Sequence, residues 1–157
     1  SYIVDDFFGN PRGSKNSIGA FEGGHSTFYV YGRGCAGAGG FVPTMGSIGE
    51  LKMGSTSFGL VLRKASGASR TGFLALGVTK VNVGLGGGCF LLVSPDLVVR
   101  VPIFGVPGPG NGSALMGLPL PSDPRLKGAH VRCQWGVIDP AAAGIGIAFS
   151  QAATLTL

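Results

Sequence analysis

The sequence predicts an all-β fold, a jelly-roll-like β-sandwich that follows an N-terminal extension. Short runs of Val, Leu, Ile and Phe bounded by Gly and Pro recur along the chain and are typical of strands. No window places apolar residues at i, i+3, i+4 and i+7 over three turns, so we expect no long helix. Because 45% of the residues are hydrophobic, the 30 glycines and 10 prolines indicate turns and bulges of a folded chain rather than disorder.

The domain organisation follows from length and from a change in composition. A chain of 157 residues suits one domain with enough length to bury a core. Residues 1–25 contain only short apolar pieces separated by Gly, Asn, Pro and charged residues, so they cannot build a core of their own. We therefore expect an extension over residues 1–25 and a sandwich domain over residues 26–157.

Two features predict a secreted chain without a membrane span. The sequence begins at Ser1 rather than Met, which suits a processed product whose signal peptide has been removed. No stretch of about 18 uninterrupted apolar residues is present, so nothing is expected to cross a bilayer. The expected location is outside the cell or at its surface.

Strands are expected wherever apolar and β-branched residues alternate or cluster between turn residues. The expected strands cover residues 26–31, 47–53, 57–64, 71–78, 80–83, 129–139, 145–149 and 153–157. Two further apolar runs, 89–93 and 97–101, flank the turn Ser94-Pro95-Asp96 and predict a β-hairpin that other strands must cover. Residues 119–128 predict one helical turn, with Asp123 as its cap.

The strand expected over residues 129–139 shows which side chains enter the core. One face carries Val131, Cys133, Trp135 and Val137, and the other carries His130, Arg132 and Gln134. Because the first face is apolar, Cys133 and Trp135 are predicted to be core residues. The same alternation places Gln134 on the outward face.

Charge and metal-ligand spacing exclude two classes of function. The net charge is +5, but the 12 Lys and Arg residues are scattered, whereas nucleic-acid binding needs a concentrated basic face. The three cysteines lie far apart without CxxC spacing and are joined by only two histidines, so no metal site and no cofactor are predicted. One disulfide and one free thiol is the expected cysteine count.

No catalytic residue is predicted, and the chain is not expected to be an enzyme. No Gly-x-Ser-x-Gly elbow is present, and His25 and His130 show no spacing that suggests a relay. The seven acidic residues are mostly explained by local turns, and nothing selects a pair that faces a cleft. The glycine-rich stretch 32–40 lacks the Gly-Lys-Ser/Thr and the helix of a phosphate-binding loop.

Several pieces of the sequence form a pattern that is recognisable by their order and spacing. They are Gly32-Arg-Gly-Cys35-Ala-Gly-Ala-Gly-Gly40, Gly88-Cys89-Phe-Leu-Leu-Val93, Leu118-Pro-Leu-Pro-Ser-Asp-Pro-Arg-Leu-Lys-Gly128, Gln134, Asp139 and Ile147-Ala-Phe-Ser150. This pattern resembles a Gly-rich domain found in large secreted proteins of environmental bacteria.

The resemblance implies an extracellular β-sandwich in which Cys35 is joined to Cys89, and it implies no catalytic residue. The residues agree with this pairing, because both cysteines follow a glycine at the edge of an expected strand, whereas Cys133 lies mid-strand. This chain departs from the pattern in having Cys133 as an added cysteine and in carrying the extension.

The extension suggests a function in assembly. Its large apolar side chains are the predicted subunit contacts: Tyr2, Ile3, Val4, Phe7, Phe8, Ile18 and Phe21. An apolar extension ahead of an all-β domain suits β-strand addition, in which one copy completes the sheet of the next and builds a filament. We therefore expect a structural subunit of an extracellular, pilus-like filament whose partners are copies of itself. A fold-back of residues 1–25 onto their own domain is the competing expectation.

The alternative function is a secreted, monomeric carbohydrate-binding or adhesion module, with polysaccharide as its partner. Its candidate sugar-stacking platform consists of the aromatic residues Phe28, Tyr29, Tyr31 and Trp135. Strand alternation places them on different faces, and core packing explains most of them. Purified protein should form long polymers under the first reading and stay monomeric under the second.

Overall fold

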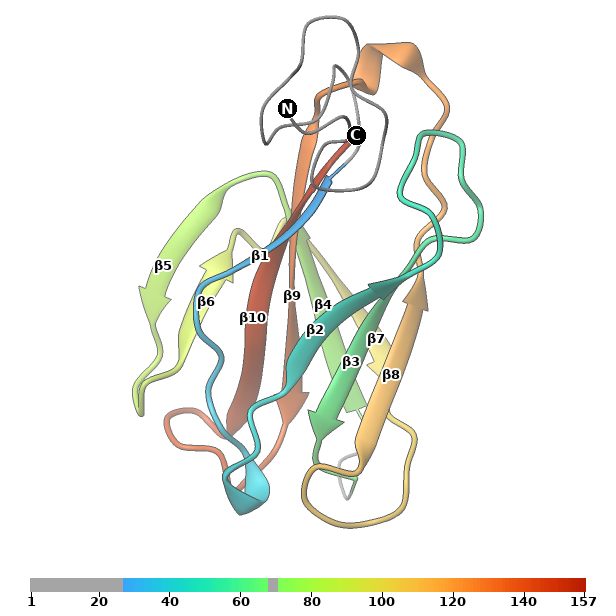
Figure 1. The fold of residues 1–157 in the computed structure, drawn as a ribbon. Coiled ribbons are helices and arrows are strands. Elements are labelled where there is room, and N and C mark those ends of the chain that lie inside the picture. The colour runs from blue at the N-terminus through green and yellow to red at the C-terminus, as the bar shows by residue number, and fades with distance from the viewer. Residues whose placement is uncertain (1–26, 68–70) are drawn as a thin grey trace, which may run out of the picture.

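The computed structural model describes residues 27–67 and 71–157, and this part of the chain is built almost wholly of strands (Figure 1). The expected extension lies outside the described residues. The strands are β1 (Thr27–Tyr31), β2 (Thr44–Ile48), β3 (Gly59–Ala65), β4 (Thr71–Gly77), β5 (Lys80–Gly84), β6 (Phe90–Val93), β7 (Leu97–Pro102), β8 (Gly112–Gly117), β9 (His130–Ile138) and β10 (Ile147–Thr156). Two single-turn 3-10 helices, η1 (Ala38–Gly40) and η2 (Pro124–Leu126), complete the described elements.

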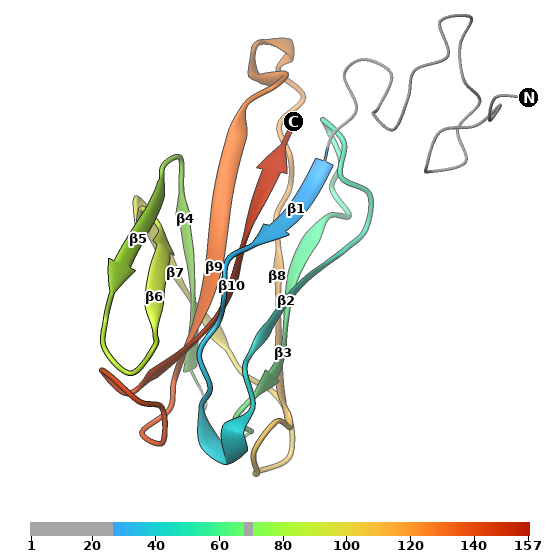
Figure 2. The ribbon, with the colours of Figure 1, turned by 60° about the vertical axis from the view of Figure 1, so that its left-hand side comes forward.

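The strands form two facing sheets and one small outer hairpin. The larger sheet has the order β1-β10-β9-β4-β7, the second has β2-β3-β8, and β5 pairs with β6. Figure 2 shows the hairpin, the five-stranded sheet and the three-stranded sheet as successive layers. All pairings between these strands are antiparallel. The prediction of an all-β sandwich is therefore confirmed.

A single buried cluster joins the two larger sheets. Leu60 and Leu62 of β3 pack there with Leu74 of β4 and with Cys133 and Trp135 of β9, and all five side chains are fully buried. Alternation explains this arrangement, because side chains two residues apart on a strand point to the same face. The core thus lies between the sheets, and the expected core face of β9 is the face that meets β3.

The prediction of a β-hairpin over residues 89–101 is wrong. β6 pairs with β5 in the small sheet, whereas β7 pairs with β4 in the five-stranded sheet. Residues 94–96 cross between the sheets, and Asp96 fixes the crossing by accepting hydrogen bonds from Ser94 Oγ at 2.9 Å and Val78 N at 3.0 Å. The physical reason is ladder length: β7 pairs with six residues of β4, while β6 contains only four residues.

Other expected elements differ in extent. The strand β8 was not expected, and the two strands expected over 145–149 and 153–157 form one strand, β10, with an irregularity between Phe149 and Ala152. The expected helical turn is present as η2, where the Asp123 side chain accepts a hydrogen bond from Arg125 N at 3.0 Å. That cap is confirmed.

Candidate functional site

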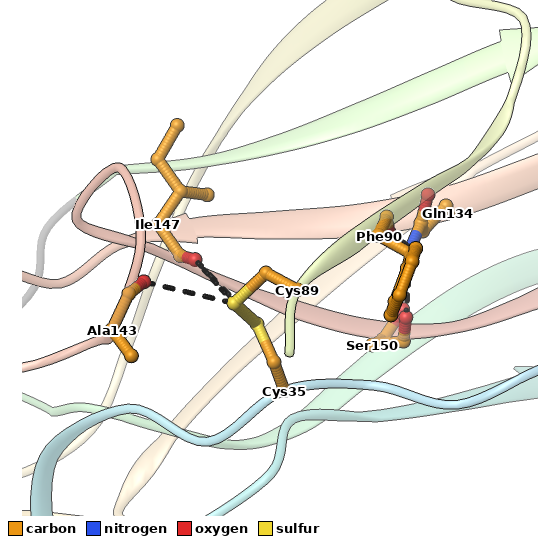
Figure 3. Close-up of a disulfide and its surroundings, with 7 residues drawn as sticks. All are labelled: Cys35, Cys89, Phe90, Gln134, Ala143, Ile147 and Ser150. Carbon is orange, nitrogen blue, oxygen red and sulfur yellow. Dashed lines mark hydrogen bonds between the residues drawn. A yellow bond between two sulfur atoms is a disulfide. The ribbon is translucent and has the colours of Figure 1, made fainter. Parts of the chain in front are cut away.

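The β5–β6 hairpin is fastened to the outer face of the five-stranded sheet by a disulfide. Cys35, in the glycine-rich loop after β1, is bonded to Cys89 at the start of β6 (Figure 3). The predicted pairing is confirmed, and Cys133 is the free cysteine of the described residues. The backbone of the glycine-rich loop reaches β10 as well, because Cys35 N donates to Phe149 O at 2.8 Å.

Gln134 provides the second fastening of the hairpin. Its Oε1 accepts a hydrogen bond from Leu92 N at 2.9 Å, and its Nε2 donates to Phe90 O and to Ser150 O, each at 3.0 Å. The sequence placed Gln134 outward, and it does lie opposite the core face of β9. The hairpin nevertheless covers it, so that its side chain is 1% exposed.

A third contact orders the glycine-rich loop. The buried carboxylate of Asp139 accepts hydrogen bonds from Ala38 N at 2.7 Å and from Ala141 N at 3.0 Å. A side chain at Gly37 would collide with this carboxylate, so the loop needs glycine there. Several residues of the glycine-rich pattern, Cys35, Cys89, Gln134, Asp139 and Ser150, therefore gather at one place, where their contacts hold backbone segments together.

On the side of the sandwich away from β1 and β2, two strand edges are open. β7 is the last strand of the five-stranded sheet and β8 the last of the three-stranded sheet. The segment between them bridges the edges at one point, where Phe104 and Ser113 exchange two backbone hydrogen bonds of 2.8 Å. Within the described ranges, no strand pairs with the outer side of β7. We call this side, residues 97–117, the open side.

The open side exposes large apolar side chains. Five of them are between 50% and 69% exposed: Leu97, Val98, Phe104, Val106 and Leu115. Edge strands of natural proteins are usually protected by charge, by proline or by a covering segment. β7 carries one charge, Arg100, and ends in Pro102, so its first three residues present an apolar edge without such protection. A surface of this kind is typical of an interaction site.

A small apolar pocket opens beside β7 on the outer face of the five-stranded sheet. Its volume is about 160 Å³. Strands β4, β7, β9 and β10 form its floor, and the hairpin provides one wall. The lining residues are Phe73, Ala75, Leu91, Pro95, Val98, Gln134, Gly136, Ile147 and Phe149. The Gln134 amide is hydrogen-bonded to backbone groups, so the pocket offers almost wholly apolar contacts.

A shallower hollow of about 530 Å³ lies beside β8 on the outer face of the three-stranded sheet. Ile48, Val61, Leu115 and Phe104 line it together with Arg63. The charged residues of β3, β4, β7 and β8 are Arg63, Lys64 and Arg100. The strands on both sides of the open side therefore carry basic charge and no acidic charge.

A third hollow, of about 430 Å³, lies between the hairpin and β1. Tyr31 and Phe90 line it with the polar residues Arg33, Lys80 and Asn82. The Lys80 ammonium lies 4.3 Å from the centre of the Tyr31 ring, whose hydroxyl donates to Leu92 O at 3.0 Å. Burial raises the pKa of Tyr31. This hollow offers aromatic and hydrogen-bonding groups together.

The four aromatic residues considered as a sugar platform do not lie together. Trp135 is fully buried, Phe28 packs against the core, and Tyr29 is 66% exposed on the edge strand β1. Of the four, Tyr31 is the one that lines the hollow beside the hairpin.

Cys133 and His130, two titratable side chains of β9, lie in different surroundings. Burial raises the pKa of the Cys133 thiol to about 12, so it stays protonated and unreactive. His130 lies at the surface, with Nδ1 at 2.9 Å from Thr156 Oγ1. Across residues 27–67 and 71–157, no three His, Cys, Asp or Glu side chains gather in a way that could hold a metal ion.

The predicted subunit-contact residues of the extension lie outside the described residues. The structure instead shows an exposed strand edge that sequence reasoning missed, with Val98, Arg100 and the pocket beside them. One signal in the sequence could have indicated it. Pro102 cannot donate to a ladder and is found at edges, so its place after an apolar run indicates an edge strand.

No family model, curated protein or solved structure matches the chain. The resemblance to Gly-rich secreted domains therefore stays a prediction. Among the described residues, no helix has both the length and the apolar character needed to cross a membrane. The disulfide is consistent with an oxidising environment such as the extracellular space.

Proposed function

We propose that the protein is a structural subunit of an extracellular filament. The N-terminal extension of one copy adds as a strand to the open side of the next copy. The contact is head-to-tail, so it extends into a polymer wherever successive copies do not close into a ring. The extension supplies the apolar donor, and the apolar edge of β7 is the acceptor.

The relative position of the two edges of one sheet carries this proposal. β1 and β7 are the opposite edges of the five-stranded sheet, and the extension precedes Thr27, the first residue of β1. A donor segment that starts at one edge and an acceptor at the other are the two halves of a head-to-tail contact. The exposed residues Leu97 and Val98 of β7 give the acceptor edge its apolar character.

A second candidate is supported by the hollow between the hairpin and β1. Aromatic rings beside hydrogen-bonding side chains are suited to a saccharide, because the rings stack on apolar sugar faces while polar groups bind hydroxyls. Tyr31, Phe90 and Asn82 provide both kinds of group. Under this reading the protein is a monomeric polysaccharide-binding module.

The experiment compares the full chain with a chain lacking residues 1–25, using light scattering and electron microscopy. Our proposal predicts polymers from the full chain, and folded monomers from the truncated chain. A full chain that stays monomeric at all concentrations contradicts it. In parallel, the full chain and its Phe90→Ala variant are titrated with soluble polysaccharides. Binding by a monomer that weakens in the variant favours the second candidate.

A further inference from the structure

We infer that the apolar pocket beside β7 is a socket for Phe7 from the extension of a second copy. In the same contact, Asp5 of that extension pairs with Arg100. This inference rests on the proposed function and names the acceptor site and the residues that meet there.

The pocket has the volume and lining to accept one aromatic ring. Its volume is about 160 Å³, and a dry apolar cavity of about 150 Å³ in another protein is large enough to bind benzene. Small residues make room for the ring, since Ala75 and Gly136 lie in the pocket and the rings of Phe73 and Phe149 line it. A ring in this position would be packed on several sides by apolar atoms.

The spacing of residues in β7 matches the spacing in the extension. Val98 and Arg100 lie two residues apart on the outer face of β7, and Val98 lines the pocket. Asp5 and Phe7 are likewise two residues apart, so in a strand they share one face. An antiparallel strand that places Phe7 opposite Val98 therefore places Asp5 opposite Arg100, where the charges are complementary.

The neighbouring residues fit the same register. Phe8 then lies opposite Leu97, whose side chain is 56% exposed, and an aromatic–aliphatic pair covers it. Residues 1–8 carry two aspartates and no basic residue. Arg100 is the one charged residue on β4 and β7, so the pairing of Asp5 with Arg100 selects this register over a shift by two.

The test uses the full chain and two variants that block opposite halves of the contact. Ala75→Leu adds three carbon atoms inside the pocket and blocks the socket, while Phe7→Ser removes the inserted ring. Each variant alone should weaken assembly by about 10- to 100-fold. That factor corresponds to the roughly 1.5–3 kcal/mol gained on burying a phenylalanine, at about 1.4 kcal/mol per tenfold.

Mixing the two variants gives the decisive result. The Ala75→Leu copy keeps its Phe7, and the Phe7→Ser copy keeps its socket, so one intact contact forms between them. We expect heterodimers of one copy each, which cannot extend. The matched controls are Ala141→Leu, at an exposed alanine outside the pocket, and Phe7→Leu, which keeps an apolar side chain.

A charge exchange provides a test that does not alter the pocket. Arg100→Glu or Asp5→Lys alone should weaken assembly several-fold, and the double variant should restore it. Lys127→Glu, an exposed charge reversal on another part of the surface, should leave assembly unchanged. Circular dichroism and thermal melting establish that each variant is folded. If Ala75→Leu fails to fold, the charge exchange still tests whether Asp5 pairs with Arg100 in the proposed register.

The outcomes separate this inference from the proposed function. A full chain that never assembles contradicts both. A full chain that assembles while the Phe7, Ala75 and Arg100 variants assemble equally well overturns the socket alone. Heterodimers in the mixture, together with rescue by the charge exchange, support it.

Discussion

Replacing Gln134 by Ala should strongly destabilise the domain, although its strand neighbours place it on the face away from the core. The change removes the three hydrogen bonds that the side chain makes to backbone groups of Phe90, Leu92 and Ser150. The bonds to Leu92 N and Ser150 O are buried, and a buried polar group left unsatisfied costs about 1–3 kcal/mol. Phe90 is partly exposed, so water can replace its bond. Two such groups together give an expected loss of about 2–6 kcal/mol.

Chemical denaturation measures this loss, with Gln151→Ala as the matched control. Gln151 is exposed and donates one long hydrogen bond of 3.3 Å to Gly32 O, so its replacement should change stability by less than about 0.5 kcal/mol. For a domain of this size, Gln134→Ala should also lower the melting temperature by roughly 5–15 °C. If both variants unfold at the same denaturant concentration, Gln134 does not hold the hairpin.

Three further predictions concern the core and the cysteines. Trp135→Ala should cost about 3–5 kcal/mol in denaturant melts, because the ring is fully buried, and a loss below about 1 kcal/mol would refute its core position. The Cys35–Cys89 disulfide closes a loop with a sequence separation of 54, so its reduction should lower the free energy of unfolding by about 4 kcal/mol in the chain-entropy model. A disulfide peptide that contains Cys133 in a non-reduced digest would contradict the pairing. Burial raises the pKa of Cys133 to about 12, above its value in the unfolded chain. The stability that the protonated thiol contributes is therefore present below about pH 9 and is lost as the pH rises toward 12. Cys133→Ala should flatten this part of the pH–stability profile, and native protein at pH 8 should resist alkylation that denatured protein undergoes; rapid native labelling would refute its burial.

Local patterns predict much of this fold because they depend on neighbours in sequence. The alternation of Val131, Cys133, Trp135 and Val137 identifies the face of β9 that meets β3. The cap of η2 follows from Asp123 and Pro124 alone, since both act on adjacent backbone. Features of this kind need no knowledge of which strands become partners.

Partner choice could not be read from the sequence in the same way. The runs that became β6 and β7 are apolar and joined by a short turn, so a hairpin satisfies every local rule, yet each strand pairs elsewhere. β8 was missed because its sequence, Gly-Ser-Ala-Leu-Met-Gly, has few β-branched or aromatic residues, and its place beside β3 supplies the stabilisation.

The surface that we propose as the acceptor depends on the same long-range pairing. If residues 97–101 formed a hairpin covered by other strands, as the sequence predicts, Leu97 and Val98 would be buried. They become an exposed edge only when β7 pairs with β4 and no described strand follows it. The pocket beside Val98 likewise needs the hairpin wall, which Gln134 and the disulfide hold in place.

The central claim, that copies join through an added strand at β7, is tested most directly by amide hydrogen exchange. Exchange is measured on the full chain at concentrations below and above the point of assembly. Our account predicts that the amides of residues 97–101 that face away from β4 become protected on assembly, while those of β3, at the centre of the other sheet, exchange at unchanged rates. Assembly that leaves the β7 amides as exchangeable as in the monomer would contradict the account.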